Sequence, residues 1–161
     1  MNEHERGMLE DAAKLWLAHD GLWFQAVEQS FGMDKAIELD KLAWERFTVI
    51  EAKRIMARHN IAPNGGLAAL KLALSYRLYA YINVQDIVDA TPTSFTFRMT
   101  DCRVQSARQR QQMQPFPCRE VGIVEYSLFA QTIDPRIRTE CVCCPPDPKH
   151  PQFWCAWKFS L

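Results

Sequence analysis

The first half of the chain has the hydrophobic spacing of long helices. Over residues 8–31, apolar side chains recur every three or four positions, and Gly32 follows as a typical helix stop. Gly21 lies inside this stretch and allows a kink or break, because glycine costs about 1 kcal/mol relative to alanine within a helix. A second helix is predicted over residues 34–58, with Asp34 as its N-terminal cap.

The second predicted helix carries two hydrophobic stripes instead of one. The first stripe comprises Ala36, Leu39, Ala43, Phe47, Ile50 and Ala57, and the second comprises Ile37, Trp44 and Ile55. A helix with one buried face needs a single stripe, so two stripes predict two neighbours, a sheet and a partner subunit. We therefore expect a homodimer that forms through the helical half, with Trp44 at the contact.

The second half of the chain changes to alternating patterns that are typical of strands. After a turn at residues 63–66, the pattern predicts a third helix over residues 67–79. Strands and two further helices are then expected, the strands at residues 84–88, 95–99, 136–143 and 153–160 and the helices at residues 102–112 and 118–133. This order predicts an α+β fold in which N-terminal helices pack on a small antiparallel sheet with two inserted helices. Residues 1–161 are expected to form one domain, with a helical half at 1–82 and a sheet half at 83–161.

Composition and charge argue against several classes of protein. Of the 161 residues, 48% are hydrophobic, which is enough for a packed core. Lys+Arg and Asp+Glu number 19 each, so the formal net charge is zero and nucleic-acid binding is not expected. No apolar run approaches the ~20 residues that cross a bilayer, and the acidic N-terminal stretch does not resemble a secretory signal. We expect a cytoplasmic protein that does not associate with membranes.

Six cysteines, all after residue 101, are the main candidates for chemistry. A reducing compartment favours a metal site or buried thiols over disulfides. Cys141 and Cys144 have the Cys-x-x-Cys spacing of a metal knuckle, Cys155 lies on the returning strand, and Cys118 supplies a fourth thiol for tetrahedral zinc. The alternative is that Cys141, Cys143 and Cys155 are small buried residues on the inner face of a hairpin. An extended strand pairs Cys141 with Cys143, whereas a knuckle pairs it with Cys144.

Two of the thiols, Cys102 and Cys118, are expected at helix N-termini. The free backbone N–H groups there favour a thiolate and lower its pKa, which suits a nucleophile or a metal ligand. Cys102 is the candidate nucleophile, and Arg108 lies within two helical turns of it. The acidic residues of the helical half are interpreted as surface charges, namely Glu28, Glu38, Asp40 and Glu51.

Several motifs along most of the chain carry a family resemblance. They include Trp23-Phe24, Phe31-Gly32, Asp101-Cys102-Arg103-Val104-Gln105, Phe116-Pro117-Cys118, Glu125-Tyr126, Ile133-Asp134-Pro135-Arg136, and the closing Cys-Pro-Pro-Asp and Cys-x-Trp-x-Phe. In these motifs the chain resembles an uncharacterised family of bacterial cytosolic proteins. In its layout it is distantly similar to the L-2-amino-thiazoline-4-carboxylic acid hydrolase family. The 4-vinyl reductase small-molecule-binding domain looks like a more remote relative.

The resemblance to the hydrolase family implies hydrolytic opening of a small cyclic amidine that carries a carboxylate. We expect a small-molecule site between the helical half and the sheet, next to zinc held by Cys118, Cys141, Cys144 and Cys155. Arg108, Arg136 and Tyr126 would bind the substrate, an arginine holding its carboxylate, and Asp134 would be the general base. The alternatives are a non-catalytic ligand-binding or sensor module with structural zinc, and an interaction module that uses the tryptophan-rich helices.

Overall fold

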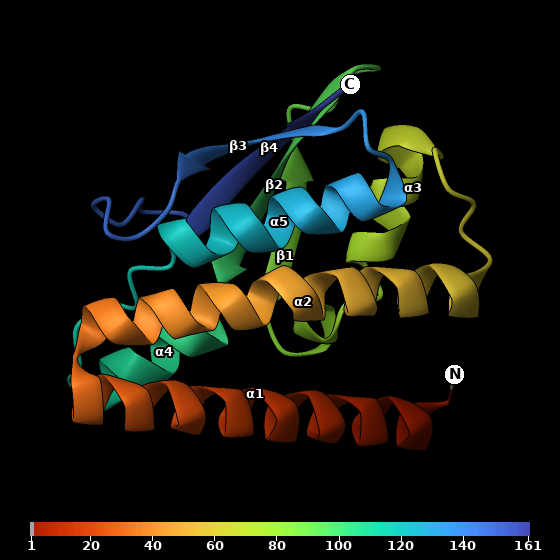
Figure 1. Cartoon of the computed structure of the whole chain (residues 1–161). Coiled ribbons are helices and arrows are strands. Elements are labelled where there is room, and N and C mark those ends of the chain that lie inside the picture. Colours follow the sequence, from red (N-terminus) through yellow and green to blue (C-terminus); the bar gives the residue numbers. More distant parts are fainter. Residues whose placement is uncertain (1) are drawn as a thin grey trace.

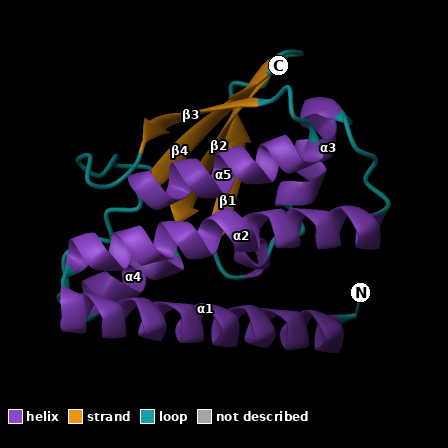
Figure 2. Cartoon of the chain, viewed as in Figure 1, coloured by secondary structure: helices purple, strands orange, loops and turns teal. Residues whose placement is uncertain are grey.

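Helices and strands form separate layers in the structure, a computed structural model that describes residues 2–161. Helices α1 (Glu3–Phe31) and α2 (Met33–His59) run antiparallel, and α5 (Arg119–Ile133) lies between α2 and the sheet (Figure 1). The short helix α4 (Arg103–Arg110) lies beside the ends of α1 and α2 that meet at their connecting turn (Figure 1). Figure 2 shows the strands gathered on one side of α5 and the long helices on the other. The predicted α+β class is confirmed.

Four antiparallel strands make the sheet, in the order β1-β2-β4-β3. They are β1 (Val84–Val88), β2 (Ser94–Asp101), β3 (Arg138–Cys143) and β4 (Cys155–Ser160). All four predicted strands are present, and β3 and β4 each begin two residues later than expected. The delay before β3 has a local cause, because the N–H of Ile137 donates to the carbonyl of the helix-end residue Asp134 and closes a turn.

The turn between the two long helices depends on a glycine. Gly32 caps the end of α1 and also the start of α2, with a φ of +86° that residues with a side chain rarely adopt. The predicted helix stop is therefore confirmed. The prediction that Asp34 caps α2 is wrong, because Gly32 occupies that position and Asp34 lies in the first turn of the helix. Helix α1 continues through Gly21 without a break.

The third helix is shorter than predicted. Helix α3 (Gly66–Leu74) ends five residues early, and a 3-10 helix, η1 (Leu78–Tyr81), follows it. Arg77, between the two, has an extended backbone with φ −66° and ψ 150°. That conformation lets its guanidinium reach the carboxylates of Glu51 on α2 and Glu125 on α5, at 2.9 and 2.6 Å. A buried ion pair thus overrides the helical preference of the local sequence.

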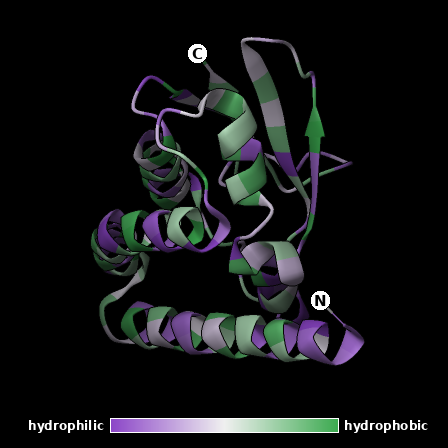
Figure 3. Ribbon diagram, turned by 90° about the vertical axis from the view of Figure 1, so that its right-hand side faces the viewer, coloured by the Kyte–Doolittle hydropathy of each residue, from purple (hydrophilic) through white to green (hydrophobic). Residues whose placement is uncertain are grey.

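Helix α1 contributes little to the interior. Only Ala13 and Leu17 are buried along it, whereas Leu15, Leu22 and Trp23 are 72%, 66% and 64% exposed. In Figure 3 the helix that begins at the N-terminal label alternates between hydrophilic and hydrophobic positions along its length. The main core instead lies between α5, α3 and the inner face of the sheet.

One glycine in α5 lets the helix approach the sheet closely. The indole of Trp157 on β4 packs against Gly122, and a Cβ added there would stand 2.5 Å from a ring carbon. We expect Gly122→Ala to lower the free energy of unfolding by about 1–3 kcal/mol, because the buried indole has to shift. Urea unfolding measures the change. Gly7→Ala is the control, since nothing lies within 4 Å of a Cβ at that position, and equal midpoints for the two variants would contradict the close contact.

Candidate functional site

Four cysteines from separate segments meet next to the start of α5. Cys102 and Cys118 are the N-cap residues of α4 and α5, Cys144 follows β3, and Cys155 begins β4. The sulfurs of Cys118 and Cys144 are 3.1 Å apart, and the neighbouring Cys155 contributes to the raised pKa of Cys144. Cys102, Cys118 and Cys155 line a cavity of about 60 Å³. The predicted helix-end positions of Cys102 and Cys118 are confirmed.

Cys141 is placed differently from the other predicted zinc ligands. Strand β3 is extended as far as Cys143, and its burial alternates so that Cys141 and Cys143 are both half-buried while Val142 between them is exposed. Cys141 and Cys143 thus share the burial pattern of a strand, which has a register shift between them, and do not form a Cys-x-x-Cys knuckle with Cys144. Cys141 lies beside the Arg119 guanidinium and lines neither cavity. Within residues 2–161, no three or more His, Cys, Asp or Glu side chains already surround one point as metal ligands do.

Burial controls the protonation of these thiols. It raises the pKa of Cys102 to about 12, although the backbone N–H groups of Gln105 and Val104 at the start of α4 act in the opposite direction. The expectation of a lowered pKa at this helix N-terminus is therefore wrong, because desolvation of the thiolate outweighs the helix end. Hydrogen bonds with Cys118 and Cys155, together with burial, raise the pKa of Cys144. Cys102 is accordingly a poor nucleophile in this state.

A larger cavity of about 340 Å³ lies beside the thiol cluster, between α1, α2, α4 and α5. Much of its wall is aromatic or aliphatic, including Phe24, Trp44 and Phe116. Tyr79, Cys118 and Glu125 line both cavities, so the two spaces share a wall. A concave apolar space with a few polar groups is the usual form of a small-molecule site.

Three carboxylates from three different helices line the larger cavity. They are Asp20 of α1, Asp40 of α2 and Glu125 of α5. Burial, followed by the negative charges of Asp20 and Glu125, raises the pKa of Asp40 to about 7. Burial also raises the pKa of Asp20 and that of Glu125, and in Glu125 the neighbouring Arg77 counteracts it. Each carboxylate thus increases the cost of ionising the others.

Arg77 lines neither cavity but forms an ion pair with one of these carboxylates, that of Glu125. Its side chain is 2% exposed and lies between Glu51 and Glu125, close to the aromatic ring faces of Trp44 and Phe129. Burial opposes its charge, but the two carboxylates outweigh burial and raise the pKa of Arg77. One guanidinium therefore faces two buried carboxylates.

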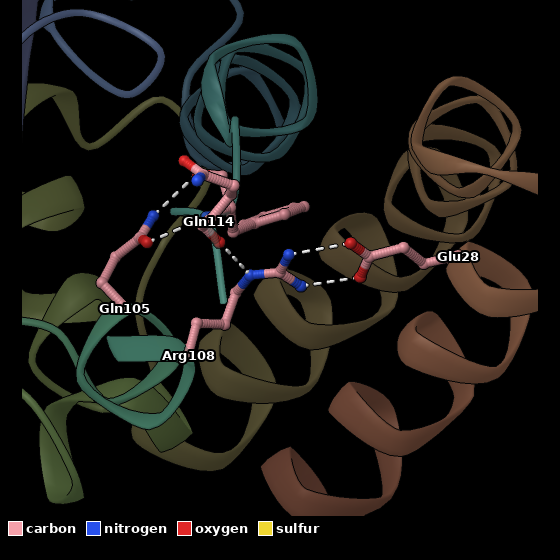
Figure 4. A network of polar contacts seen from close by, with 5 residues as sticks. Glu28, Gln105, Arg108 and Gln114 are labelled. Carbon is pink, nitrogen blue, oxygen red and sulfur yellow. Dashed lines mark hydrogen bonds and ion pairs between the residues drawn. The ribbon is translucent and has the colours of Figure 1, made fainter. Parts of the chain in front are cut away.

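Arg108 makes three hydrogen bonds to protein groups. Its guanidinium donates two hydrogen bonds to the Glu28 carboxylate, at 2.8 and 2.9 Å, and one to the carbonyl of Gln114 at 2.6 Å (Figure 4). The adjacent Gln105 side chain exchanges two hydrogen bonds with the backbone of Phe116. This network ties α1, α4 and the segment before α5 together. Arg108 lines the cavity, and its role in binding a substrate carboxylate stays a prediction, with three of its N–H donors engaged by Glu28 and Gln114.

Asp134 and Arg136 lie at the other end of α5 and line neither cavity. The Asp134 carboxylate accepts hydrogen bonds from the Gly66 N–H at 3.0 Å and from the side chain of Arg136 at 2.9 Å. These hydrogen bonds, that of Arg136 first, lower the pKa of Asp134. The predicted roles of Asp134 as general base and Arg136 as carboxylate receptor stay predictions; in the structure the pair joins α3 to the end of α5.

Tyr126 is buried and lines only the smaller cavity, where its ring lies 4.9 Å from that of Trp157. Burial raises the pKa of its hydroxyl. The prediction that it contacts a substrate is untested, and the structure assigns it mainly to the core.

The sequence predicted surface positions for Asp40, Glu51 and Glu28, but Asp40 lines the cavity, Glu51 pairs with Arg77 and Glu28 pairs with Arg108. The spacing contained a signal, because Asp40 and Glu51 fall on the same helical face as Trp44 and Ile55 in the second hydrophobic stripe. A charge within an apolar stripe indicates a buried partner or a site.

Fold and site together define an α+β domain with an acid-lined cavity and a neighbouring thiol cluster. The chain belongs to DUF6125, a family of unknown function, which it matches over residues 2–161. Neither a curated protein nor a solved structure matches it. In the part of the chain that the structure describes, no helix is both long enough and apolar enough to span a membrane.

Proposed function

We propose that this domain binds a small organic molecule with a cationic nitrogen group, such as an amine or amidine, in the larger cavity. The observation that carries the proposal is the convergence of Asp20, Asp40 and Glu125 on that cavity. Isolated buried carboxylates are costly, and an organic cation in the cavity would compensate them.

The charge balance of the buried groups supports this proposal. Arg77 neutralises one of its two partners, Glu51 and Glu125, so the ion-pair group retains one negative charge when all three are ionised. Asp20 and Asp40 add to it. The wall facing the cavity is thus electronegative, and a cation there gains from each carboxylate without displacing an existing partner.

Two arginines on α4 favour a ligand that also carries an anionic group. Arg103 and Arg110 line the same cavity, are exposed, and form no ion pair with a carboxylate of residues 2–161. They take the place of Arg108 and Arg136 as candidates for a carboxylate. A ligand with a cation inside and a carboxylate at the mouth fits the cyclic amidine carboxylate that the resemblance to the hydrolase family implies. If that ligand is hydrolysed, Asp40 is the candidate general base, since its pKa of about 7 suits proton transfer near neutral pH.

Ligand binding is tested by thermal unfolding with 2-aminothiazoline-4-carboxylate at millimolar concentration. We expect a rise in Tm, because a ligand that prefers the folded state stabilises it. The ligand-induced increase in Tm should be less than half as large in Asp40→Asn. It should be unchanged in the control Glu38→Gln, because Glu38 is an exposed residue on the same helix. A thiazoline carboxylate without the amidine nitrogen should give no shift. Equal shifts with both compounds would contradict a cation site.

The same binding should depend on pH with a defined sign. A bound cation prefers ionised Asp40, whose pKa in the empty protein is about 7, so protonation below that pH competes with binding. The affinity should therefore rise by up to about tenfold between pH 6 and pH 8. Calorimetric titration at both values measures the change, and Asp40→Asn should remove it. Product formation, followed by chromatography, separates a hydrolase from a sensor module that binds without turnover.

A further inference from the structure

Independently of the larger cavity, we propose that Cys102, Cys118, Cys144 and Cys155 form a binding site for a thiophilic metal ion, with Zn²⁺ as the ion to test. This set differs from the one expected from the sequence, because Cys102 takes the place of Cys141.

The convergence of the four thiols is the first observation. They come from four segments that are separated in the sequence, yet Cys102, Cys118 and Cys155 together line the small cavity, and the sulfur of Cys144 lies 3.1 Å from that of Cys118. The cavity volume of about 60 Å³ accommodates an ion. Three thiols around this space and a fourth beside one of them correspond in number and type to a structural zinc site.

A hydrogen-bond donor directed at one of the sulfurs is the second observation. The Gln105 side-chain amide lies 3.7 Å from the sulfur of Cys118. Donors of this kind stabilise metal-bound thiolates and orient them. Both Cys102 and Cys118 also stand at helix N-termini, where negative charge is favoured.

The segment that carries Cys144 is fixed on the start of α5. Asp147 accepts a hydrogen bond from the backbone N–H of Cys144 at 3.3 Å and forms an ion pair with Arg119. The Arg119 N–H in turn donates to the carbonyl of Pro145 at 3.0 Å. These contacts hold Cys144 against Cys118, so the fold positions both thiols.

Metal binding would require a small rearrangement and would release protons. Two sulfurs bound to the same tetrahedral zinc lie roughly 3.8 Å apart, so Cys118 and Cys144 would move apart from 3.1 Å by less than about 1 Å. Zn²⁺ and four thiols would give a tetrathiolate complex of net charge −2, and the four thiol protons would go to solvent.

The test uses the full chain purified without added metal. Elemental analysis should find about one zinc per chain, and replacement by Co²⁺ should give the visible and near-ultraviolet bands of a tetrahedral thiolate complex. Cys102→Ser should weaken zinc binding at least about tenfold in competition with a chromophoric chelator, whereas Cys141→Ser should bind as the unmodified protein does.

A second measurement applies even where a serine variant fails to fold. Alkylation followed by peptide mapping should label Cys141 and Cys143 in the native protein, and should label the four cluster cysteines only after a strong chelator is added. Three results would overturn the proposal: absence of metal together with alkylation unchanged by the chelator, a Cys118–Cys144 disulfide in metal-free protein, or loss of zinc in Cys141→Ser but not in Cys102→Ser.

Discussion

Replacing Arg77 by methionine is expected to lower the free energy of unfolding by about 3–5 kcal/mol. The guanidinium is 2% exposed and is the ion-pair partner of both Glu51 and Glu125, so its removal leaves two carboxylates buried side by side. Their repulsion and desolvation then act without compensation. Urea unfolding at neutral pH, followed by circular dichroism, measures the change.

Two further variants show that the effect comes from the uncompensated charges. Arg98→Met removes a partly exposed ion pair with Asp86 and should cost less than about 1 kcal/mol. Replacing Arg77, Glu51 and Glu125 together by apolar residues should recover most of the loss, because no charge is then left without a partner. A loss below 1 kcal/mol for Arg77→Met alone would mean that the carboxylates are protonated or hydrated.

Trp44→Ala is expected to cost about 3–5 kcal/mol of stability as well, through loss of packing. Trp44 is 5% exposed, and its ring lies 6.3 Å from that of Trp16, 5.2 Å from that of Phe47 and 6.1 Å from that of Tyr79. The prediction that Trp44 forms a subunit contact is therefore wrong: the second stripe of α2 is buried within the chain. Chemical unfolding measures the loss, and a folded, stable Trp44→Ala protein would contradict this assignment.

The homodimer itself stays a prediction. Its contact would have to use the first hydrophobic stripe of α2, because the second is buried within the chain. Leu39 and Ile50 on the first stripe are 40% and 55% exposed, so this stripe offers accessible apolar positions on α2. Ile50→Glu should leave the stability of the chain within about 0.5 kcal/mol of the original, since the side chain is not in the core. Sizing chromatography of this variant separates the effect on assembly from the effect on folding.

Local patterns predicted most of the elements of this fold. The two-residue alternation of buried Phe95, Phe97 and Met99 identified β2, because one face of the strand is buried and the other is not. Helix α3 was predicted too long because its end is set by Arg77, whose partners Glu51 and Glu125 are remote in the sequence. No local propensity contains that interaction.

The candidate site was predictable only in part, for a similar reason. Cys118, Cys144 and Cys155, which were grouped from their residue type, lie near one another in the structure, while their role as zinc ligands stays a prediction. That Cys102 lies beside them, whereas Cys141 does not, depends on how β3 pairs with β4, which decides the direction of each side chain. The acidic cavity depends on three helices that meet only in the folded chain, so helical spacing could place Asp40 on an apolar face but could not supply its neighbours.

The position of β4 in the sheet has a consequence for how the protein is made. Strand β4 follows β3 in the sequence but lies between β2 and β3 in the sheet. Met99 of β2 therefore pairs with Cys155 of β4, which is far from it in the sequence. The α1–α2 and β1–β2 hairpins can form early in folding, since the contacts within each are local, whereas α2 also needs the distant α5. Strand β3 has no partner strand before β4 is in place, and the edge of β2 that β4 occupies stays unpaired until then. An unpaired strand edge is prone to aggregation, so the sheet is expected to be vulnerable until its central strand is inserted.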